Sequence, residues 1–260
     1  MRLNYDTFTG RRSAFVCVAA CLILLSWAAF AVLSPRIAEF LGQFLTGRNR
    51  LTAGLLLIQN GLVVLSVLIA APLTDRKYSL KEKLGLEFDK DYTFQFFFPK
   101  LCIAVLVTLG VQIGLSYLLK AVGHEPKEQS MVEFFRTLKP VAFVCFALIT
   151  VIAAPIAEEM AFRHIFYRFV RVFLYKKEAA VVISLIFALI HVPFGAFSKG
   201  TPFPWEYFVI PVVPLFVLAL FLQREYEKSH SIVPSVLIHA AFNLVSVLLL
   251  ALQVAYGVGE

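Results

Sequence analysis

Charged residues are scarce in this chain of 260 residues: Asp, Glu, Lys and Arg make up 16% of the positions, against about a quarter in a typical soluble domain. Hydrophobic residues reach 60%, and the mean hydropathy is +0.80. So little charge cannot cover the surface of a water-soluble domain of this length. The composition therefore excludes an ordinary soluble protein and predicts an integral membrane protein whose solvent is the lipid bilayer.

Cysteine and membrane-embedded aspartate are also rare, and both absences limit the chemistry. The four cysteines lie inside apolar runs without metal-ligand spacing, so we expect neither a disulfide nor a zinc-cysteine site. All four aspartates fall in the N-terminal tail or in loops, which argues against an aspartyl protease dyad. No Gly-x-Ser-Gly motif for a serine protease is present. The residues concerned are Cys17, Cys21, Cys102 and Cys145, and Asp6, Asp75, Asp89 and Asp91.

Apolar runs long enough to cross a bilayer recur along the whole sequence. They predict an all-α transmembrane bundle of seven to eight spans that forms a single domain over residues 1–260. The first run follows two arginines but is too long for a signal peptide, so it is interpreted as a retained span. The expected spans are Ala14–Leu33, Leu51–Leu73, Leu101–Leu119, Val141–Ala157 with a continuation, Ala179–Phe197, Tyr207–Leu222 and Ile232–Tyr256.

Two further segments lie between the apolar runs and contain charged residues. Residues 158–175 keep helical apolar spacing but carry arginines, so they either lengthen the fourth helix or form an eighth, interfacial one. Residues 74–92 are polar, with mixed charges, and are expected to form a structured loop.

The net charge of +7 is distributed as membrane topology requires, because Lys and Arg lie almost wholly between the apolar runs. No basic groove is implied, and no nucleic-acid partner is expected. The loops with more Lys and Arg are those that share a side with the N-terminus. This bias predicts a cytoplasmic N-terminus and, for seven spans, a C-terminus on the other side. We expect a multi-pass protein of a bacterial-type inner membrane. It also predicts a site near Glu158 that faces the cytoplasm.

A charged side chain inside a membrane helix costs about 2.5–3.5 kcal/mol on insertion scales, so such residues usually have a partner or a function. The fourth apolar run leads into Glu158, Glu159 and Arg163. Glu159 and Arg163 are four residues apart, which predicts an ion pair on one helix face. Glu158 projects about 100° away and needs another partner. Pro155 removes a backbone donor, which predicts a distorted helix and a polar pocket nearby.

Two further apolar runs each carry a histidine. His191 follows Phe187 by four residues, and Pro193 marks the end or bend of that helix. His239 and Asn243 are four residues apart in the last span and so share a face. Because unpartnered polar groups are costly in a bilayer, we expect these three polar faces to converge on one hydrated cavity.

Several other polar residues are interpreted as structural. His164 lies on a different face from Glu158 and is expected to pack or to lie at the interface. Gln59 and Asn60 in the second span are expected to link helices, as membrane amides commonly do. His124 and His230 lie in loops.

Taken in order, Glu158-Glu159-x-x-x-Arg163, Phe187-x-x-x-His191 and His239-x-x-x-Asn243 resemble the motifs of the CAAX protease and bacteriocin-processing family, also called the Abi family. The resemblance covers about residues 150–247, which would form the catalytic core. It implies an intramembrane endopeptidase of glutamate type, similar to type II CAAX prenyl endopeptidases. The implied substrate is a membrane-anchored or lipidated protein or peptide.

Within that expectation, Glu158 is the general base, His191 positions the attacking water, and His239 and Asn243 stabilise the oxyanion. Glu159, Arg163 and Phe187 are supporting residues, and no cofactor is expected. The alternative chemistry is a zinc protease with Glu158, His191 and His239 as ligands, which sequence alone leaves open.

A different functional class is a proton-coupled transporter or a non-catalytic binding protein. It is disfavoured because the paired repeats with broken helices that typify transporters are not found. A catalytically inactive immunity or scaffold protein is disfavoured because no motif position is lost.

Overall fold

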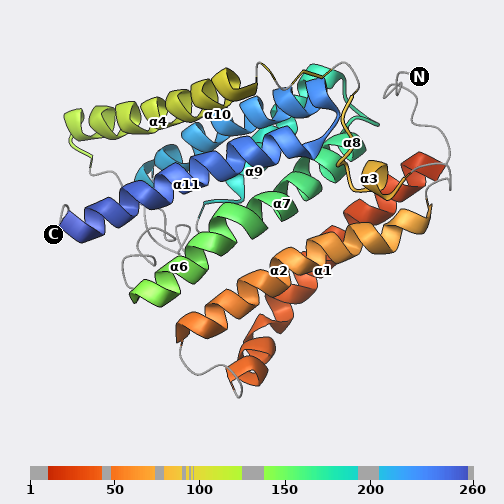
Figure 1. Ribbon diagram of the computed structural model, residues 1–260, viewed down its shortest axis with the longest axis horizontal. Coiled ribbons are helices and arrows are strands. Elements are labelled where there is room, and N and C mark those ends of the chain that lie inside the picture. Colours follow the sequence, from red (N-terminus) through yellow and green to blue (C-terminus); the bar gives the residue numbers. More distant parts are fainter. Residues whose placement is uncertain are drawn as a thin grey trace.

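The computed structural model describes residues 11–42, 48–73, 79–89, 92–93, 95, 97–124, 138–192 and 205–256, and these residues contain helices and no strand. The helices pack as one elongated bundle (Figure 1). Helix α1 (Arg11–Gly42) begins at one end of this bundle, and α11 (Ile232–Tyr256) ends at the opposite end. The expected all-α membrane bundle is confirmed.

Six helical segments among the described residues are long and apolar enough to cross a membrane. They lie in α1, in α2 (Arg48–Ala70) with the 3-10 turn η1 (Ala71–Leu73), in α4 (Phe97–Ala121), in a composite helix, in α10 (Trp205–Ser229) and in α11. Their bounds as spans are Ala14–Phe40, Thr52–Leu73, Phe97–Ala121, Pro140–Val170, Val209–Ser229 and Ile232–Tyr256.

The fifth expected span, Ala179–Phe197, differs from the structure in length. Helix α9 runs from Lys176 to Leu189, which is 14 residues, and the chain turns at Ile190 to Val192. A helix of this length covers about 21 Å, less than the roughly 30 Å of hydrocarbon in a bilayer. The apolar run continues beyond Leu189, but the helix does not; residues 193–204 lie outside the described residues.

The composite fourth span settles the ambiguity over residues 158–175, because the chain stays helical through Val170 as one continuous span. It consists of α6 (Pro140–Leu148), the π-helical η3 (Ile149–Ala153), α7 (Ala154–Glu159), the π-helical η4 (Met160–Phe166) and α8 (Tyr167–Val170). Each π-turn widens the helix; such turns are often found at functional sites. The distortion expected beside Pro155 is therefore present as the wide turn of η3, just before the proline.

Two spans are longer than their apolar runs indicate, because polar side chains satisfy groups that would otherwise end the helix. Pro35 lies inside α1 and cannot donate to the carbonyl of Ala31. The hydroxyl of Ser34 donates to that carbonyl instead, at 3.3 Å. Helix α10 continues through a charged stretch to Ser229 because Glu225 pairs with Lys100 and Lys228.

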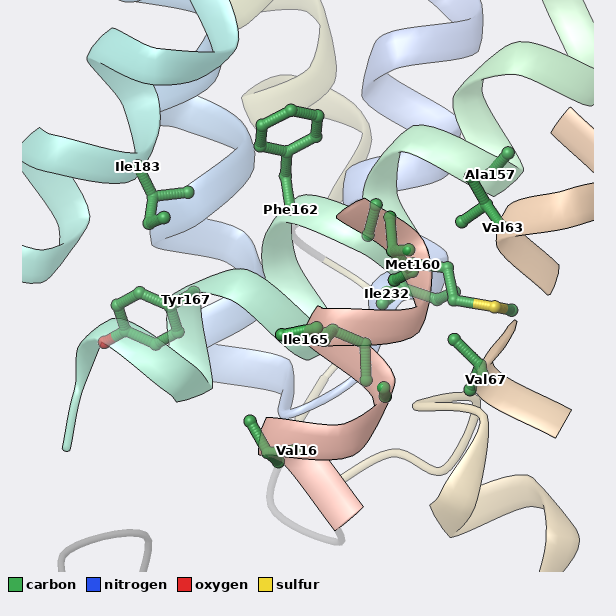
Figure 2. Packing of buried hydrophobic residues seen from close by; sticks show 14 of the residues in the cluster. Val16, Val63, Val67, Ala157, Met160, Phe162, Ile165, Tyr167, Ile183 and Ile232 are labelled. Carbon is green, nitrogen blue, oxygen red and sulfur yellow. The ribbon is translucent and has the colours of Figure 1, made fainter. Parts of the chain in front are cut away.

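The fourth span forms the centre of the main apolar core. Met160, Phe162 and Ile165 of η4 are buried against residues of α1, α2 and α9. Figure 2 shows Met160 pointing toward Val63 and Val67 of α2. A second core joins α4, α9, α10 and α11. The outer faces of the helices remain apolar, as lipid contact requires. On α4, for example, the exposed side chains include Ile103, Leu106, Ile113 and Leu118.

The polar loop before α4 is structured in its described part, as expected. It contains α3 (Leu80–Lys83), capped by Ser79, and then Gly85 with φ +71°. The carbonyl of Gly85 accepts from the backbone N–H of Ile232 at 2.8 Å, and the N–H of Asp89 donates to Ser229 at 2.7 Å. These bonds attach the loop to the tight turn between α10 and α11.

Candidate active site

The side chain of Glu158 lies between two imidazoles that come from other helices. Its Oε2 is 3.8 Å from Nε2 of His191 and 3.9 Å from Nε2 of His239. This oxygen is buried and has no hydrogen-bond partner among the described residues. The Glu158 side chain as a whole is 24% exposed, so it is accessible on one side. The fourth span, the end of α9 and α11 thus meet at Glu158.

His191 is fixed by its own helix. Its Nδ1 lies 2.7 Å from the backbone carbonyl of Phe187. A carbonyl can only accept, so Nδ1 carries the proton and donates it. In the neutral ring Nε2 is then an acceptor, and it is this atom that faces Glu158.

His239 is fixed by the neighbouring glutamate, not by Glu158. Its Nδ1 lies 3.0 Å from Oε1 of Glu159, and the imidazole is almost fully buried. The carboxylate of Glu159 accepts this hydrogen bond, which again leaves Nε2 directed toward Glu158. The two consecutive glutamates therefore have different surroundings: Glu158 faces the space between the rings, and Glu159 orients one of them.

Arg163 completes the surroundings of Glu159. Its Nε is 3.1 Å from Oε2 of Glu159, and both side chains are fully buried. The ion pair predicted from their spacing is thus present. The guanidinium also lies over the ring of Phe187, with 4.5 Å between its carbon and the ring centroid. That ring contacts both imidazoles, at centroid distances of 4.9 Å from His191 and 5.6 Å from His239.

Asn243 lies one turn beyond His239 on α11. Its Nδ2 donates to the backbone carbonyl of Thr150 at 2.9 Å, and Thr150 belongs to the π-turn η3. This bond uses one of the two amide hydrogens and orients the carboxamide, so a second hydrogen is left to donate.

The other polar residues named from the sequence lie apart from Glu158. The buried His164 donates from Nε2 to the carbonyl of Lys83 at 2.9 Å, which holds the α3 loop against the fourth span. The Nδ2 of Asn60 donates to Leu56 within its own helix, at 2.9 Å. All four cysteines are free thiols.

Among the described residues, no group of three or more His, Cys, Asp or Glu side chains has the geometry of a metal site. Glu158, His191 and His239 are nevertheless chemically suitable ligands, so the zinc alternative is decided by experiment.

Comparison with known proteins covers the part of the chain that contains these residues. Residues 140–245 match the family described as type II CAAX prenyl endopeptidase Rce1-like. This part of the chain is an Rce1-like domain. It begins with the composite fourth span and ends two residues beyond Asn243, so it includes every motif residue. The predicted resemblance is confirmed. No curated protein and no solved structure matches the chain significantly.

Three features of the Rce1-like domain were not found from the sequence. The spacing could not tell which of two consecutive glutamates would bond His239. The bond from Asn243 to Thr150 depends on the backbone of η3, for which Pro155 was the only signal. Gln223 lies just after the expected span Tyr207–Leu222, yet it is buried in α10, one turn after Ala219, whose carbonyl accepts from Arg163.

Proposed function

We propose that this protein is an intramembrane endopeptidase in which Glu158 activates a water molecule to hydrolyse a peptide bond. One observation carries the proposal: a carboxylate oxygen lies within 4 Å of two imidazole nitrogens in an otherwise apolar bundle. Oε2 of Glu158 and Nε2 of the neutral His191 are both hydrogen-bond acceptors. A water molecule can donate to these two acceptors, and polar atoms separated by more than 3.5 Å are commonly bridged in this way.

In the proposed reaction, water bound to Glu158 and His191 attacks the carbonyl carbon while Glu158 takes its proton. The C–N bond then breaks, and Glu158 passes that proton to the leaving amine. The products are a peptide with a new carboxyl group and a peptide with a new amine.

The oxyanion of the tetrahedral intermediate is assigned to His239 and Asn243. His239 donates from Nε2 as an imidazolium, a state that it keeps before, during and after the cycle, and the carboxylate of Glu159 balances the charge of that ring. Asn243 donates with the amide hydrogen that Thr150 does not use. Arg163 and Phe187 hold Glu159 and the rings in place.

The substrate is proposed to be a membrane-anchored peptide tail. The matched family description names a prenyl endopeptidase, so prenylated C-terminal peptides are the first substrates to test. A panel of prenylated and unprenylated tails, each incubated with purified protein, separates dependence on the lipid from dependence on the peptide.

The decisive experiment compares wild type with Glu158→Gln, His191→Ala, His239→Ala and the control Glu178→Gln. Loss of general-base catalysis is expected to lower kcat by about 10²–10⁴-fold in Glu158→Gln. Glu178 bonds the N-terminus of α9, away from the imidazoles, so its variant should retain full activity. Cleavage by Glu158→Gln at the wild-type rate would reject Glu158 as the base. Loss of activity in a chelator, restored by zinc, would favour the metal mechanism instead.

A further inference from the structure

A second set of buried polar atoms lies on the other side of the ion pair, between the fourth span and α10. Nη2 of Arg163 donates to the backbone carbonyl of Ala219 in α10 at 3.4 Å. Within a helix, the carbonyl of residue 219 is the acceptor for the backbone N–H of residue 223. The backbone of Gln223 therefore lies close to the guanidinium, and the side chain of Gln223 is almost fully buried.

Three atoms in this region have no hydrogen-bond partner among the described residues: Nη1 of Arg163, Oε1 of Gln223 and Oγ of Ser184. Ser184 lies on α9, one turn before Phe187, whose ring contacts the guanidinium. All three side chains are buried. One atom is a donor, one is an acceptor, and the hydroxyl can be either.

We propose that one water molecule is bound between Nη1 of Arg163 and Oε1 of Gln223, with Oγ of Ser184 as its third partner. Buried waters typically make about three hydrogen bonds to polar groups that otherwise lack partners. Gln223 thereby becomes a positioning residue that acts through Arg163. This inference rests on the proposed function, since its purpose is to fix the orientation of His239.

The far side of Gln223 is already anchored. Its Nε2 donates to Oε1 of Glu227 at 3.3 Å, and the same oxygen accepts from the hydroxyl of Tyr167 at 2.6 Å. Tyr167 lies one turn beyond Arg163 on the same span. Lys176 at the start of α9 is 3.5 Å from the other oxygen of Glu227. With the water in place, a closed ring of hydrogen bonds joins two turns of the fourth span to two turns of α10.

This ring controls an orientation and does not carry a proton, because the arginine stays protonated. Arg163 contacts Glu159 through Nε, and Glu159 in turn holds Nδ1 of His239. Rotation of the guanidinium moves the carboxylate, and displacement of the carboxylate turns the imidazole. The water and Gln223 oppose that rotation.

The kinetic test replaces Gln223 with Met, which keeps the length of the side chain and removes both polar atoms. Gln112→Met is the matched control, since Gln112 is a half-buried amide in α4 that is not part of this ring. We expect kcat of Gln223→Met to fall about tenfold with KM within twofold of wild type, because Gln223 does not touch the peptide. An unchanged kcat, or a rise in KM alone, would overturn the positioning role.

A second measurement does not depend on activity. A cryo-electron microscopy map of the wild-type protein that resolves ordered water is expected to show density between Arg163 and Gln223. Absence of this density would refute the water site even if Gln223→Met proved unstable. If Glu158→Gln cleaves as fast as wild type, the proposed function fails, and the map still decides the water. If Glu158 is essential but Gln223→Met keeps its kcat, the positioning role fails by itself.

Discussion

The same substitution at the two consecutive glutamates is expected to change the thermal stability of the protein by very different amounts. Glu159→Gln removes the negative charge that faces both Arg163 and His239, and all three side chains are almost fully buried. Neutralising one partner of a buried ion pair leaves the other charge uncompensated, which costs about 3–5 kcal/mol. Among the residues that the structure describes, Glu158 forms no ion pair with Lys or Arg, because it faces the two imidazoles.

The magnitude can be expressed as a change in thermal stability. For a chain of this size, 1 kcal/mol corresponds to a shift in Tm of about 2–4 °C. Glu159→Gln is therefore expected to lower Tm by roughly 10 °C. Glu158→Gln should change Tm by no more than about 2 °C, since most substitutions away from buried networks have small effects. Both variants are expected to lose cleavage activity, for different reasons.

The assay is thermal unfolding of the purified protein in one detergent at pH 7, together with cleavage of the best peptide from the panel. Glu178→Gln is the control for loss of a glutamate charge elsewhere. Equal Tm values for Glu158→Gln and Glu159→Gln would refute the division of roles between the two residues. A Glu159→Gln variant with the Tm and the cleavage activity of the wild type would also refute this division of roles.

Two further predictions concern the loop that attaches to the α10–α11 turn. Gly85 and Gly123 both have a positive φ, +71° and +83°, which L side chains rarely adopt. A Cβ added at Gly85 would lie 2.5 Å from Nδ1 of His164, whereas a Cβ added at Gly123 would meet nothing within 4 Å. Gly123→Ala is therefore expected to lower the free energy of unfolding by about 1–2 kcal/mol through the backbone conformation alone. Gly85→Ala should lower it further, because the added Cβ also clashes with His164. Equal losses for the two variants in denaturant unfolding would contradict this prediction. Burial lowers the pKa of His230 below its ordinary value of 6.5, although Asp89 opposes that shift. Because the unfolded chain then takes up the proton more readily, the wild-type protein should lose stability as the pH falls below about 6.5. Asparagine tolerates the φ of 55° that His230 adopts, so His230→Asn should reduce the loss of stability between pH 7 and pH 5. A pH dependence of Tm equal to that of the wild type would contradict this role of His230.

The sequence predicted the membrane bundle and the order of its helices because hydrophobic length alone distinguishes a bilayer span. It was less successful where contacts of polar side chains allow a helix to continue. The hydroxyl of Ser34 allows α1 to continue past Pro35, and the ion pairs of Glu225 allow α10 to extend to Ser229. Such contacts join residues whose partnership no apolar pattern reveals.

For the candidate site, helical spacing predicted the pair Glu159 and Arg163 and the common face of His239 and Asn243. It could not predict which carboxylate each imidazole would meet, because that depends on how three helices rotate against one another. Gln223 was missed for a related reason. It lies in a polar stretch just after an expected span, and only the packing of α10 against the fourth span shows that it is buried.

The shortness of α9 has a chemical consequence. Where the chain turns at the end of α9, the backbone N–H of His191 donates to the carbonyl of Ala188 at 3.2 Å instead of to Phe187, its partner in a regular helix. The imidazole of His191 donates to the carbonyl of Phe187, and that bond also determines which ring nitrogen stays free to accept. The turn that ends α9 thus leaves one carbonyl for the imidazole to bind, and the same bond directs Nε2 of His191 toward Glu158.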